Sequence, residues 1–128
     1  MEEKGLVLCD SDILIEVLDR NNQKIITALN SFGTENLCIS SVSFSEIIFG
    51  SKNKQHQQLL ESKLKTFLLI NLTSFIDTTH QELILKYSLS HKLQMQDALI
   101  AATALTFDIP LYTLNAKDFK FIKGLKLI

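Results

Sequence analysis

Short apolar runs alternate along this chain with longer segments in which apolar residues recur every three or four positions. A short apolar run bounded by polar or turn residues is typical of a buried strand. Such runs predict strands at residues 6–9, 37–40, 75–76 and 110–114, with a last edge strand at residues 125–128. None of the runs approaches the ~20 apolar residues that a membrane-spanning helix needs, so we expect no contact with a membrane.

The segments with helical spacing lie between the predicted strands. They predict helices at residues 13–18, 25–32, 43–49, 79–91 and 96–107. A further, long amphipathic helix presents one apolar face, formed by Leu59, Leu60, Leu64, Phe67 and Leu68. Strands that alternate with helices in this way indicate a parallel sheet with helices on both faces. We therefore predict one α/β domain over residues 1–128.

The composition supports a single folded domain and excludes several other classes. The 128 residues are 46% hydrophobic and 21% charged, with a formal net charge of −1. This combination excludes a disordered chain and argues against a generally basic nucleic-acid coat. Cys9 and Cys38 lie in apolar runs without the spacing of a zinc site, so we expect buried free thiols. No signal-peptide pattern is recognisable, and the expected location is the cytoplasm.

Four acidic residues fall where a parallel sheet collects its ligands. Asp10 directly follows the first predicted strand, and Glu46 lies in the helix after the second. Asp97 opens the helix at residues 96–107, and Asp118 follows the late strand. Ligands of parallel sheets bind at the carboxyl ends of the strands, so we expect these four carboxylates in one crevice.

Each of these acids also has a purely structural explanation. Asp10 can cap a helix, and Asp97 suits the positive end of a helix dipole. Ser43 and Glu46 match the spacing of a capping box, in which the glutamate satisfies a backbone amide. Asp118 can be a solvated surface charge. Taken singly, the four acids leave structural and catalytic interpretations open.

Taken together, the acids point to a metal ion. Four carboxylates in one crevice repel one another unless protons or a divalent cation neutralise them, and oxygen ligands favour Mg²⁺ or Mn²⁺. The three histidines fall in polar helical segments, where we expect surface residues rather than zinc ligands. They are His56, His80 and His91. The acidic set therefore predicts a site for a hard divalent cation.

Four segments of the chain resemble, in order, the motifs of PIN domains, and the nearest match is the VapC-type toxins of bacterial and archaeal toxin–antitoxin pairs. The segments are residues 8–15 (LCDSDILI), 43–50 (SFSEIIFG), 97–105 (DALIAATAL) and 111–119 (LYTLNAKDF). The likeness runs nearly from end to end, and the last two segments are its most specific part. It implies a three-layer α/β/α sandwich around a central, mainly parallel sheet.

The resemblance also implies a Mg²⁺- or Mn²⁺-dependent endoribonuclease. The family's first three acids match Asp10, Glu46 and Asp97. Its fourth position matches Asn115, which offers a carbonyl oxygen without charge, while Asp118 follows three residues later, so either residue can complete the metal site. Ser11 and Thr113 match hydroxyl positions near the metal, from which they would fix the carboxylate rotamers. The reaction implied is metal-assisted hydrolysis of RNA, in which the metal lowers the pKa of a bound water.

Contact with an RNA substrate needs cations near the acidic crevice. Lys52 and Lys54 frame the turn after the Glu46 helix, and Lys117 and Lys120 belong to a lysine-rich stretch after the late strand. We expect these four lysines to border the cleft and to bind RNA. Each of them is also an ordinary solubilising side chain, so the prediction depends on where the fold places them.

Protein partners follow from the resemblance alone. It implies an antitoxin, bound through an apolar helix in a groove. We expect that groove between the helical hairpin at residues 13–32 and the amphipathic helix at residues 59–68. The same likeness implies a homodimer.

Two other functions remain open at this point. Asn115 stands where an acid can stand, so one alternative is a catalytically weak or inactive PIN-like domain that binds RNA or a partner. The other is a haloacid-dehalogenase-type phosphatase, in which Asp10 is the nucleophile and Asp12 is the acid/base. A trapped phosphoaspartate would identify the phosphatase, and weak or absent Mn²⁺ binding would identify the inactive domain.

Overall fold

The computed structural model describes residues 5–128, which contain a four-stranded parallel sheet. The strands are β1 (Val7–Cys9), β2 (Leu37–Ser40), β3 (Leu68–Ile70) and β4 (Leu111–Tyr112). Their order across the sheet is β3-β2-β1-β4. Leu8 of β1 pairs with Cys38 of β2 on one side and with Leu111 of β4 on the other. The parallel sheet predicted from the alternation of strands and helices is thereby confirmed.

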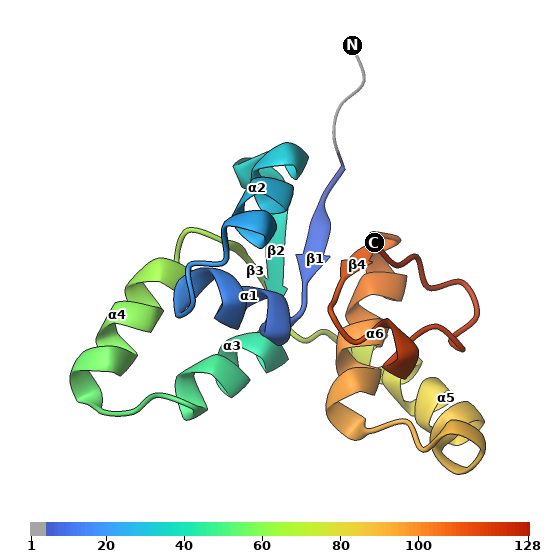
Figure 1. The fold of residues 1–128 in the computed structure, drawn as a ribbon. Helices are drawn as coiled ribbons and strands as arrows, with labels where there is room; N and C mark the ends of the chain where they lie inside the picture. The colour runs from blue at the N-terminus through green and yellow to red at the C-terminus, as the bar shows by residue number, and fades with distance from the viewer. Residues whose placement is uncertain (1–4) are drawn as a thin grey trace.

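Six α-helices of the described residues cover the two faces of this sheet. They are α1 (Ser11–Leu18), α2 (Gln23–Phe32), α3 (Ser41–Phe49), α4 (Lys54–Leu64), α5 (Ser74–His91) and α6 (Met95–Phe107), with short 3₁₀ turns η1 (Thr34–Asn36) and η2 (Ala116–Asp118). Figure 1 shows α1 to α4 on one side of the strands and α5 and α6 on the other. The three-layer α/β/α arrangement is therefore confirmed. Within residues 5–128, none of the helices combines the length and the apolar character needed to cross a membrane.

Alternate residues of the strands face the two helical layers, because successive side chains of a strand point to opposite sides. Leu8 and Cys38 join the apolar cluster made with α5 and α6. Cys9 and Ile39, the next residues along the same strands, join the cluster made with α1 to α4. Both cysteines are buried free thiols, as the sequence predicts. Packing on both faces of β1 fixes the position of Asp10 just beyond its carboxyl end.

The start of α3 differs from the capping box that the sequence allows. Ser40 is the N-cap, and its Oγ accepts a hydrogen bond from the Ser43 backbone amide at 3.0 Å. The capping-box interpretation of Ser43 and Glu46 is therefore wrong. The reason is that α3 begins directly after β2, which leaves the last residue of the strand in the capping position. Glu46 consequently lies in the middle of α3.

The third strand is misplaced in the sequence-based prediction. Residues 75–76 belong to the first turn of α5, where the Thr73 hydroxyl caps the helix by accepting a hydrogen bond from the Ile76 amide at 3.2 Å. The strand is instead β3, which the prediction includes in the apolar face of the amphipathic helix. That helix, α4, ends at Leu64, and Leu59 on its predicted apolar face is 52% exposed. A short apolar run does not distinguish an edge strand from the continuation of a helix.

The C-terminal segment joins the sheet less fully than predicted. β4 covers two residues, and residues 125–128 form a single parallel bridge, between Leu127 and Leu111, instead of a strand. The Leu111 amide donates to the Lys126 carbonyl at 2.8 Å, and the Ile128 amide donates to the Leu111 carbonyl at 2.9 Å. These bonds cover the edge of the sheet next to β4.

Candidate active site

The strand order creates a crevice at the carboxyl ends of β1 and β4. The chain runs from β1 to β2 and β3 on one side, and then returns to β4 on the other side of β1. Such a reversal separates the connections that leave the two neighbouring strands, and ligands of open parallel sheets bind there. Asp10 follows β1 directly, and Thr113 follows β4. Both residues therefore lie at the switch point of the sheet.

Asp10 is buried and firmly held at this crevice. Its Oδ2 accepts a hydrogen bond from the Thr113 hydroxyl at 2.8 Å, and its Oδ1 accepts one from the Ser11 backbone amide at 2.8 Å. Burial raises the pKa of Asp10, the bonds from Thr113 and Ser11 oppose the rise, and the charge of Asp118 adds to it. Asp10 is also the N-cap of α1, so its structural role and its place in the crevice coexist.

Glu46 reaches the same region from α3. Its Oε1 is buried without a hydrogen-bond partner among residues 5–128, and a buried oxygen that lacks a partner costs free energy. Burial raises the pKa of Glu46, the charges of Asp10 and Asp97 raise it further, and a hydrogen bond from Ser11 lowers it. Glu46 thus offers a buried carboxylate oxygen in need of a donor or a cation.

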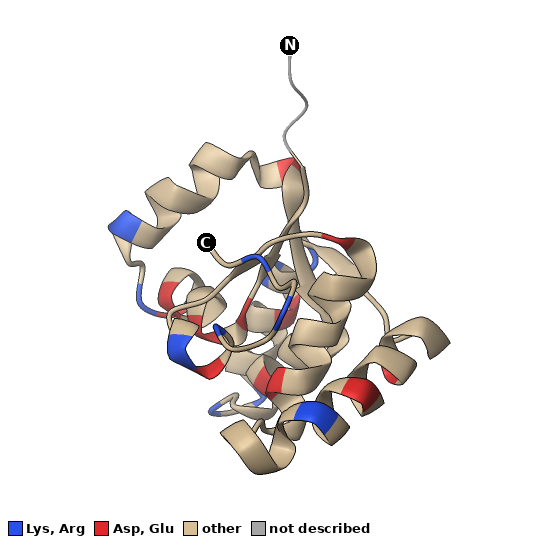
Figure 2. Ribbon diagram, turned by 90° about the vertical axis from the view of Figure 1, so that its right-hand side faces the viewer, with Lys and Arg blue, Asp and Glu red and all other residues tan. Residues whose placement is uncertain are grey.

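Asp97 and Asp118 bring two further carboxylates to the crevice. Asp97 lies in the first turn of α6, as the sequence predicts, and Asp118 ends η2 after β4. Burial, followed by the charges of Asp10 and Asp118, raises the pKa of Asp97 to about 6. Asp118 is exposed, yet its charge acts on both Asp10 and Asp97. Figure 2 shows acidic positions on several neighbouring elements in the middle of the view.

Asp12 is a fifth acid at the crevice. The sequence predicts a catalytic role for it only in the phosphatase alternative. Its Oδ2 accepts hydrogen bonds from the Leu114 backbone amide at 3.1 Å and from Asn115 Nδ2 at 2.9 Å. Its Oδ1 accepts one from the Ile13 amide at 2.7 Å. Burial, followed by the charge of Asp10, raises the pKa of Asp12 to about 6. With both oxygens engaged, Asp12 fixes the loop after β4 against the start of α1.

These bonds distinguish Asn115 from Asp118. The Asn115 side chain donates to Asp12, and its backbone amide donates to Thr113 Oγ1 at 3.0 Å. Asn115 therefore holds the loop and adds no charge, whereas Asp118 adds a charge that acts on Asp10. The Asp-Ser-Asp sequence at residues 10–12 is the signal that could have indicated a second carboxylate at this point.

The donor chemistry of the crevice fits a hard divalent cation. Its candidate donors are oxygens, which Mg²⁺ and Mn²⁺ prefer, and the buried Glu46 Oε1 has no donor among the described residues. Burial raises the pKa of the adjacent Cys9 thiol to about 12, so this thiol stays protonated and is a poor ligand. Within residues 5–128, no three Asp, Glu, His or Cys side chains are close enough as they stand to hold a metal ion. The acids therefore form an open set around the crevice.

The prediction of three surface histidines is wrong for two of them. The side chains of His56 and His80 are 17% and 18% exposed. His56 Nε2 lies 3.0 Å from Asp19 Oδ1, a contact that joins α4 to the end of α1. The ring nitrogens of His80 are buried without a hydrogen-bond partner in the described part of the chain. A polar sequence around a histidine does not show which side of its helix faces the protein.

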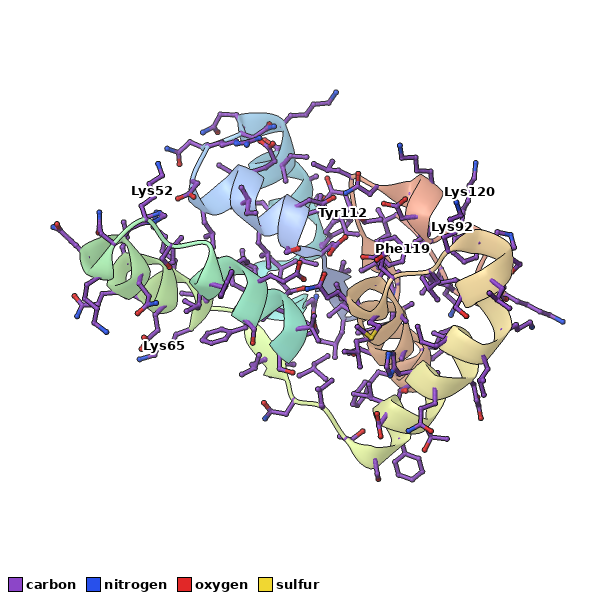
Figure 3. All side chains as sticks on the ribbon, turned by 90° about the horizontal axis from the view of Figure 1, so that it is seen from below. Lys52, Lys65, Lys92, Tyr112, Phe119 and Lys120 are labelled. Carbon is purple, nitrogen blue, oxygen red and sulfur yellow. The ribbon has the colours of Figure 1, made fainter. Side chains whose placement is uncertain are left out.

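The predicted RNA-contact lysines fall in two separate places. Lys117 lies in η2 and, together with Asp97, lines a cavity of about 260 Å³. Lys52 lies in the turn before α4, and Lys54 is the first residue of α4. Figure 3 shows Lys52 toward the α4 end of the molecule and Lys120 toward the opposite end. The fold therefore brings Lys117, but not the Lys52 pair, to a cavity that contains a candidate catalytic acid.

The fold and the crevice together define an α/β/α protein with an acidic site at the switch point of a parallel sheet. The PIN domain profile matches residues 7–124, and the chain belongs to the PIN domain family. Among curated proteins, no sequence matches the chain.

Several solved structures of toxin–antitoxin complexes contain a chain with the same fold. A chain of a toxin–antitoxin complex from Klebsiella pneumoniae is 30% identical, with 95% of each chain covered and a TM-score of 0.80. A chain of VapBC2 from Rickettsia felis, bound to a promoter DNA fragment, is 26% identical over 96% of this chain and 97% of that chain, with a TM-score of 0.83. A chain of DNA-bound VapBC from Salmonella typhimurium is 18% identical over 97% of each chain and shares the fold, with a TM-score of 0.87. The predicted resemblance to PIN domains of VapC-type systems is confirmed.

Proposed function

We propose that this PIN domain protein is a divalent-metal-dependent endoribonuclease, the toxin of a type II toxin–antitoxin pair that acts on RNA in the cytoplasm. The observation that carries the proposal is the open set of four carboxylates around the switch point, where burial and mutual repulsion raise the pKa of Asp10, Glu46 and Asp97. A bound dication relieves repulsion of this kind. Hydrolysis of a phosphodiester is a reaction that such a metal site supports.

In this proposal Asp10, Asp97 and Asp118 would hold one or two Mg²⁺ or Mn²⁺ ions, partly through water because the acidic set is open. The metal would supply a bound water of lowered pKa and positive charge for the phosphate oxygens. Glu46, whose buried Oε1 has no donor among residues 5–128, would either complete the ligand set or orient the attacking water. The four acids thus divide the work between binding the cation and placing the nucleophile.

Two hydroxyl groups position these carboxylates. The Thr113 hydroxyl donates to Asp10 Oδ2 at 2.8 Å, which selects one rotamer of a buried acid. The Ser11 hydroxyl lowers the pKa of both Asp10 and Glu46, so it acts on the acid after β1 and on the acid of α3. Groups that orient metal ligands in this way typically contribute 10–100-fold to metal affinity or activity.

Cleavage of RNA by wild type and by the Asp97→Asn variant tests this function. The substitution removes one charge and keeps the side-chain shape. Cleavage in Mn²⁺ should fall by at least about 100-fold, because losing a ligand is expected to cost more than the 10–100-fold typical for a group that orients one. The metal-free fold should be as stable as the wild type or more so, because one repelling charge is gone.

The matched control is Asp108→Asn at the other end of α6. Asp108 is the C-cap, has a left-handed backbone that asparagine tolerates, and forms an exposed ion pair with Lys126 at 3.0 Å. Surface pairs contribute little to stability, so this variant should cleave like the wild type. Full activity in Asp97→Asn, or equal loss in both variants, would contradict the proposal, and a phosphoaspartate trapped on Asp10 would identify a phosphatase instead.

An antitoxin partner is part of the proposal, and an apolar groove supports it. A cavity of about 420 Å³ lies between α1, α2 and the segment after α4, and its lining includes Val17, Ile26, Leu29 and Phe67. It occupies the region where the sequence predicts a groove for an apolar antitoxin helix. Grooves of this kind bind the apolar face of an amphipathic helix, and the similar structures are toxin–antitoxin complexes.

A homodimer is also part of the proposal, because α3, α5 and the loop before α5 expose large apolar side chains. They are Phe49, Leu72, Phe75, Leu85 and Leu89, with exposed fractions from 49% to 96%. We assign these exposed apolar side chains to the dimer contact, because apolar surface that a partner covers is typical of an interaction site. Light scattering on the purified protein should give a dimer mass, and a monomer at every accessible concentration would contradict this part.

A further inference from the structure

We propose that the cavity between the α5–α6 loop and η2 binds one nucleotide of a single-stranded RNA, next to the phosphodiester that is cut. This inference rests on the proposed ribonuclease function. The cavity has a volume of about 260 Å³, and its lining includes Lys92 and Gln94 from the loop, Lys117 from η2, and the acids Asp97 and Asp118. Small-molecule sites are typically roughly 300–1,000 Å³, so this smaller cavity fits a base or a sugar–phosphate unit and excludes a helix.

Lys92 and Lys117 supply positive charge where the acidic crevice opens. Neither forms an ion pair within residues 5–128, although Asp97 and Asp118 line the same cavity. An RNA phosphate that approaches a group of carboxylates is repelled, and unpaired ammonium groups nearby offset that repulsion. Two lysines without an ion-pair partner in the described part of the chain, beside two acids, therefore suit an anionic ligand that enters the crevice from this side.

Backbone geometry fixes the α5–α6 loop and thereby the backbone position from which the Lys92 side chain extends. Lys92 is the C-cap of α5, with φ 56° and ψ 39°, and its backbone amide donates to the Tyr87 carbonyl. Its carbonyl accepts a hydrogen bond from Gln94 Nε2 at 3.1 Å, and Leu93 between the two is buried. A site whose backbone is ordered before binding loses less conformational entropy when the ligand arrives.

The opposite wall is anchored in the core. Lys117 lies in η2, where the Asp118 amide donates to the Asn115 carbonyl at 2.9 Å. The next residue, Phe119, is 1% exposed. Figure 3 shows Phe119 toward the interior of the molecule and Lys92 toward the outside on the same side. Both walls of the cavity are therefore built on ordered backbone.

Stacked rings at the same cavity favour a ligand with a planar base. The rings of His91 and Phe121, which both line it, are stacked with centroids 4.3 Å apart and planes 12° from parallel. The Tyr87 ring packs edge-on against Phe121 at 5.2 Å. His91 is exposed, so its ring is accessible to a further planar group. Unpaired RNA bases stack on aromatic and histidine rings, and a base on His91 leaves the two phosphates that flank its sugar near the two lysines.

RNA binding by charge-neutralising variants tests this subsite. The test pair combines Lys92→Asn with Lys117→Gln; asparagine is chosen at position 92 because it tolerates the left-handed backbone. The control pair, Lys24→Gln with Lys65→Gln, removes two exposed lysines from α2 and the end of α4, and Figure 3 shows Lys65 far from Lys92. Both pairs are made in wild type for cleavage assays. They are also made with Asp97→Asn, so that binding of a short fluorescent single-stranded RNA is measured without cleavage.

The test pair should weaken RNA binding by at least about tenfold. Its plot of log affinity against log salt should be shallower by about 1.4, because two phosphate contacts to a single strand each contribute ~0.7 to the slope. His91→Ala should weaken binding by about tenfold without changing the slope, because stacking carries no charge. The control pair should bind RNA like its parent, and thermal stabilisation of the test pair by Mn²⁺ should be retained.

The outcomes separate the subsite from the function on which it rests. If wild type cleaves RNA with Mn²⁺ but test and control pairs bind RNA equally, or the salt slope does not change, the subsite is overturned alone. A larger effect of Lys52→Gln with Lys54→Gln than of the test pair would place RNA on the α4 side and would also overturn it. A wild type that neither cleaves RNA nor gains stability with Mn²⁺ would overturn the proposed function and the subsite together.

Discussion

The acidic crevice and the apolar groove lie at opposite ends of α1 and present opposite kinds of surface. At the N-terminal end, burial and the charge of Asp10 raise the pKa of Asp12 to about 6. Toward the C-terminal end, Val17 lines the groove together with Ile26 and Phe67. Repelling charges in one region and uncovered apolar surface in the other are both unfavourable in the isolated protein. Each region can therefore gain free energy from a ligand of matching character, a dication in the first and an apolar helix in the second.

The two regions also differ in the interactions that stabilise their structure. The crevice depends on directional hydrogen bonds, such as the 2.8 Å bond from Thr113 to Asp10. The groove depends on packing around side chains such as Leu29, which is 3% exposed. Loss of a single hydroxyl group should therefore lower the activity of the crevice. Binding in the groove should be weakened most by a buried charge.

Ile26→Asp should give the largest effect of these variants, a loss of antitoxin binding in the groove. An aspartate covered by an apolar partner helix loses its water without gaining a counter-ion, at a cost of at least about 3 kcal/mol, so antitoxin affinity should fall by more than about 100-fold. Calorimetric titration with the proposed antitoxin measures this effect. The control is Thr27→Asp at the neighbouring, exposed position of α2.

RNA cleavage by folded Ile26→Asp should match the wild type, because Ile26 lines the groove and not the crevice. Circular dichroism checks that the variant is folded. Unchanged antitoxin affinity would refute the groove as the docking site. Loss of cleavage in the folded variant would show that the two ends of α1 are not independent.

Thr113→Val should lower RNA cleavage by an intermediate amount. The substitution keeps the volume but removes the donor to Asp10 Oδ2 and the acceptor of the Asn115 amide. RNA cleavage should fall by about 10–100-fold, with antitoxin affinity unchanged. Thr113→Ser retains the hydroxyl and should recover most of the activity, so equal loss in both variants would assign the effect to packing instead of the hydrogen bond.

The pH dependence of stability should give the smallest effect. Burial, followed by the charges of Asp10 and Asp118, raises the pKa of Asp97 to about 6 from its ordinary 3.8, so the folded state binds more protons between these values. This contribution to stability is complete below about pH 4 and is lost as the pH rises through about 6. Between pH 7 and pH 5, the melting temperature of the metal-free wild type should gain roughly 2–4 °C more than that of Asp97→Asn.

Scanning calorimetry at the two pH values, with Asp108→Asn as the control, measures this difference. Millimolar Mn²⁺ should reduce it, because a cation stabilises the ionised acids. An equal pH response in wild type and Asp97→Asn would show that the crevice stores no electrostatic strain at Asp97.

The fold was predictable where burial makes the sequence pattern unambiguous. β1 and β2 are buried along their whole length, and they are continuous apolar runs up to Ser40 at the end of β2. β3 lies at the edge of the sheet, with Leu68 51% and Leu69 41% exposed. Its residues extend the apolar pattern of α4, so sequence spacing alone could not separate strand from helix.

The crevice was predictable to the extent that strand ends determine it. Asp10 is predicted because a parallel sheet gathers the groups that follow its strands, and Asp97 because it opens the helix predicted at residues 96–107. The contact of Asp12 with Asn115 joins residues 103 positions apart, and the position of Lys92 beside Asp97 depends on a left-handed turn between two helices. Contacts of this kind depend on loop geometry that the periodicity of the chain does not encode.

Titration of Mn²⁺, followed by electron paramagnetic resonance of the free ion, tests the central claim most directly. The wild type should bind one or two ions per chain. Affinity should fall by at least about tenfold in Asp97→Asn and in Glu46→Gln, and it should be unchanged in Asp108→Asn. A wild type that binds no Mn²⁺ at millimolar concentration, or crevice variants that bind it as tightly as the wild type, would contradict the account.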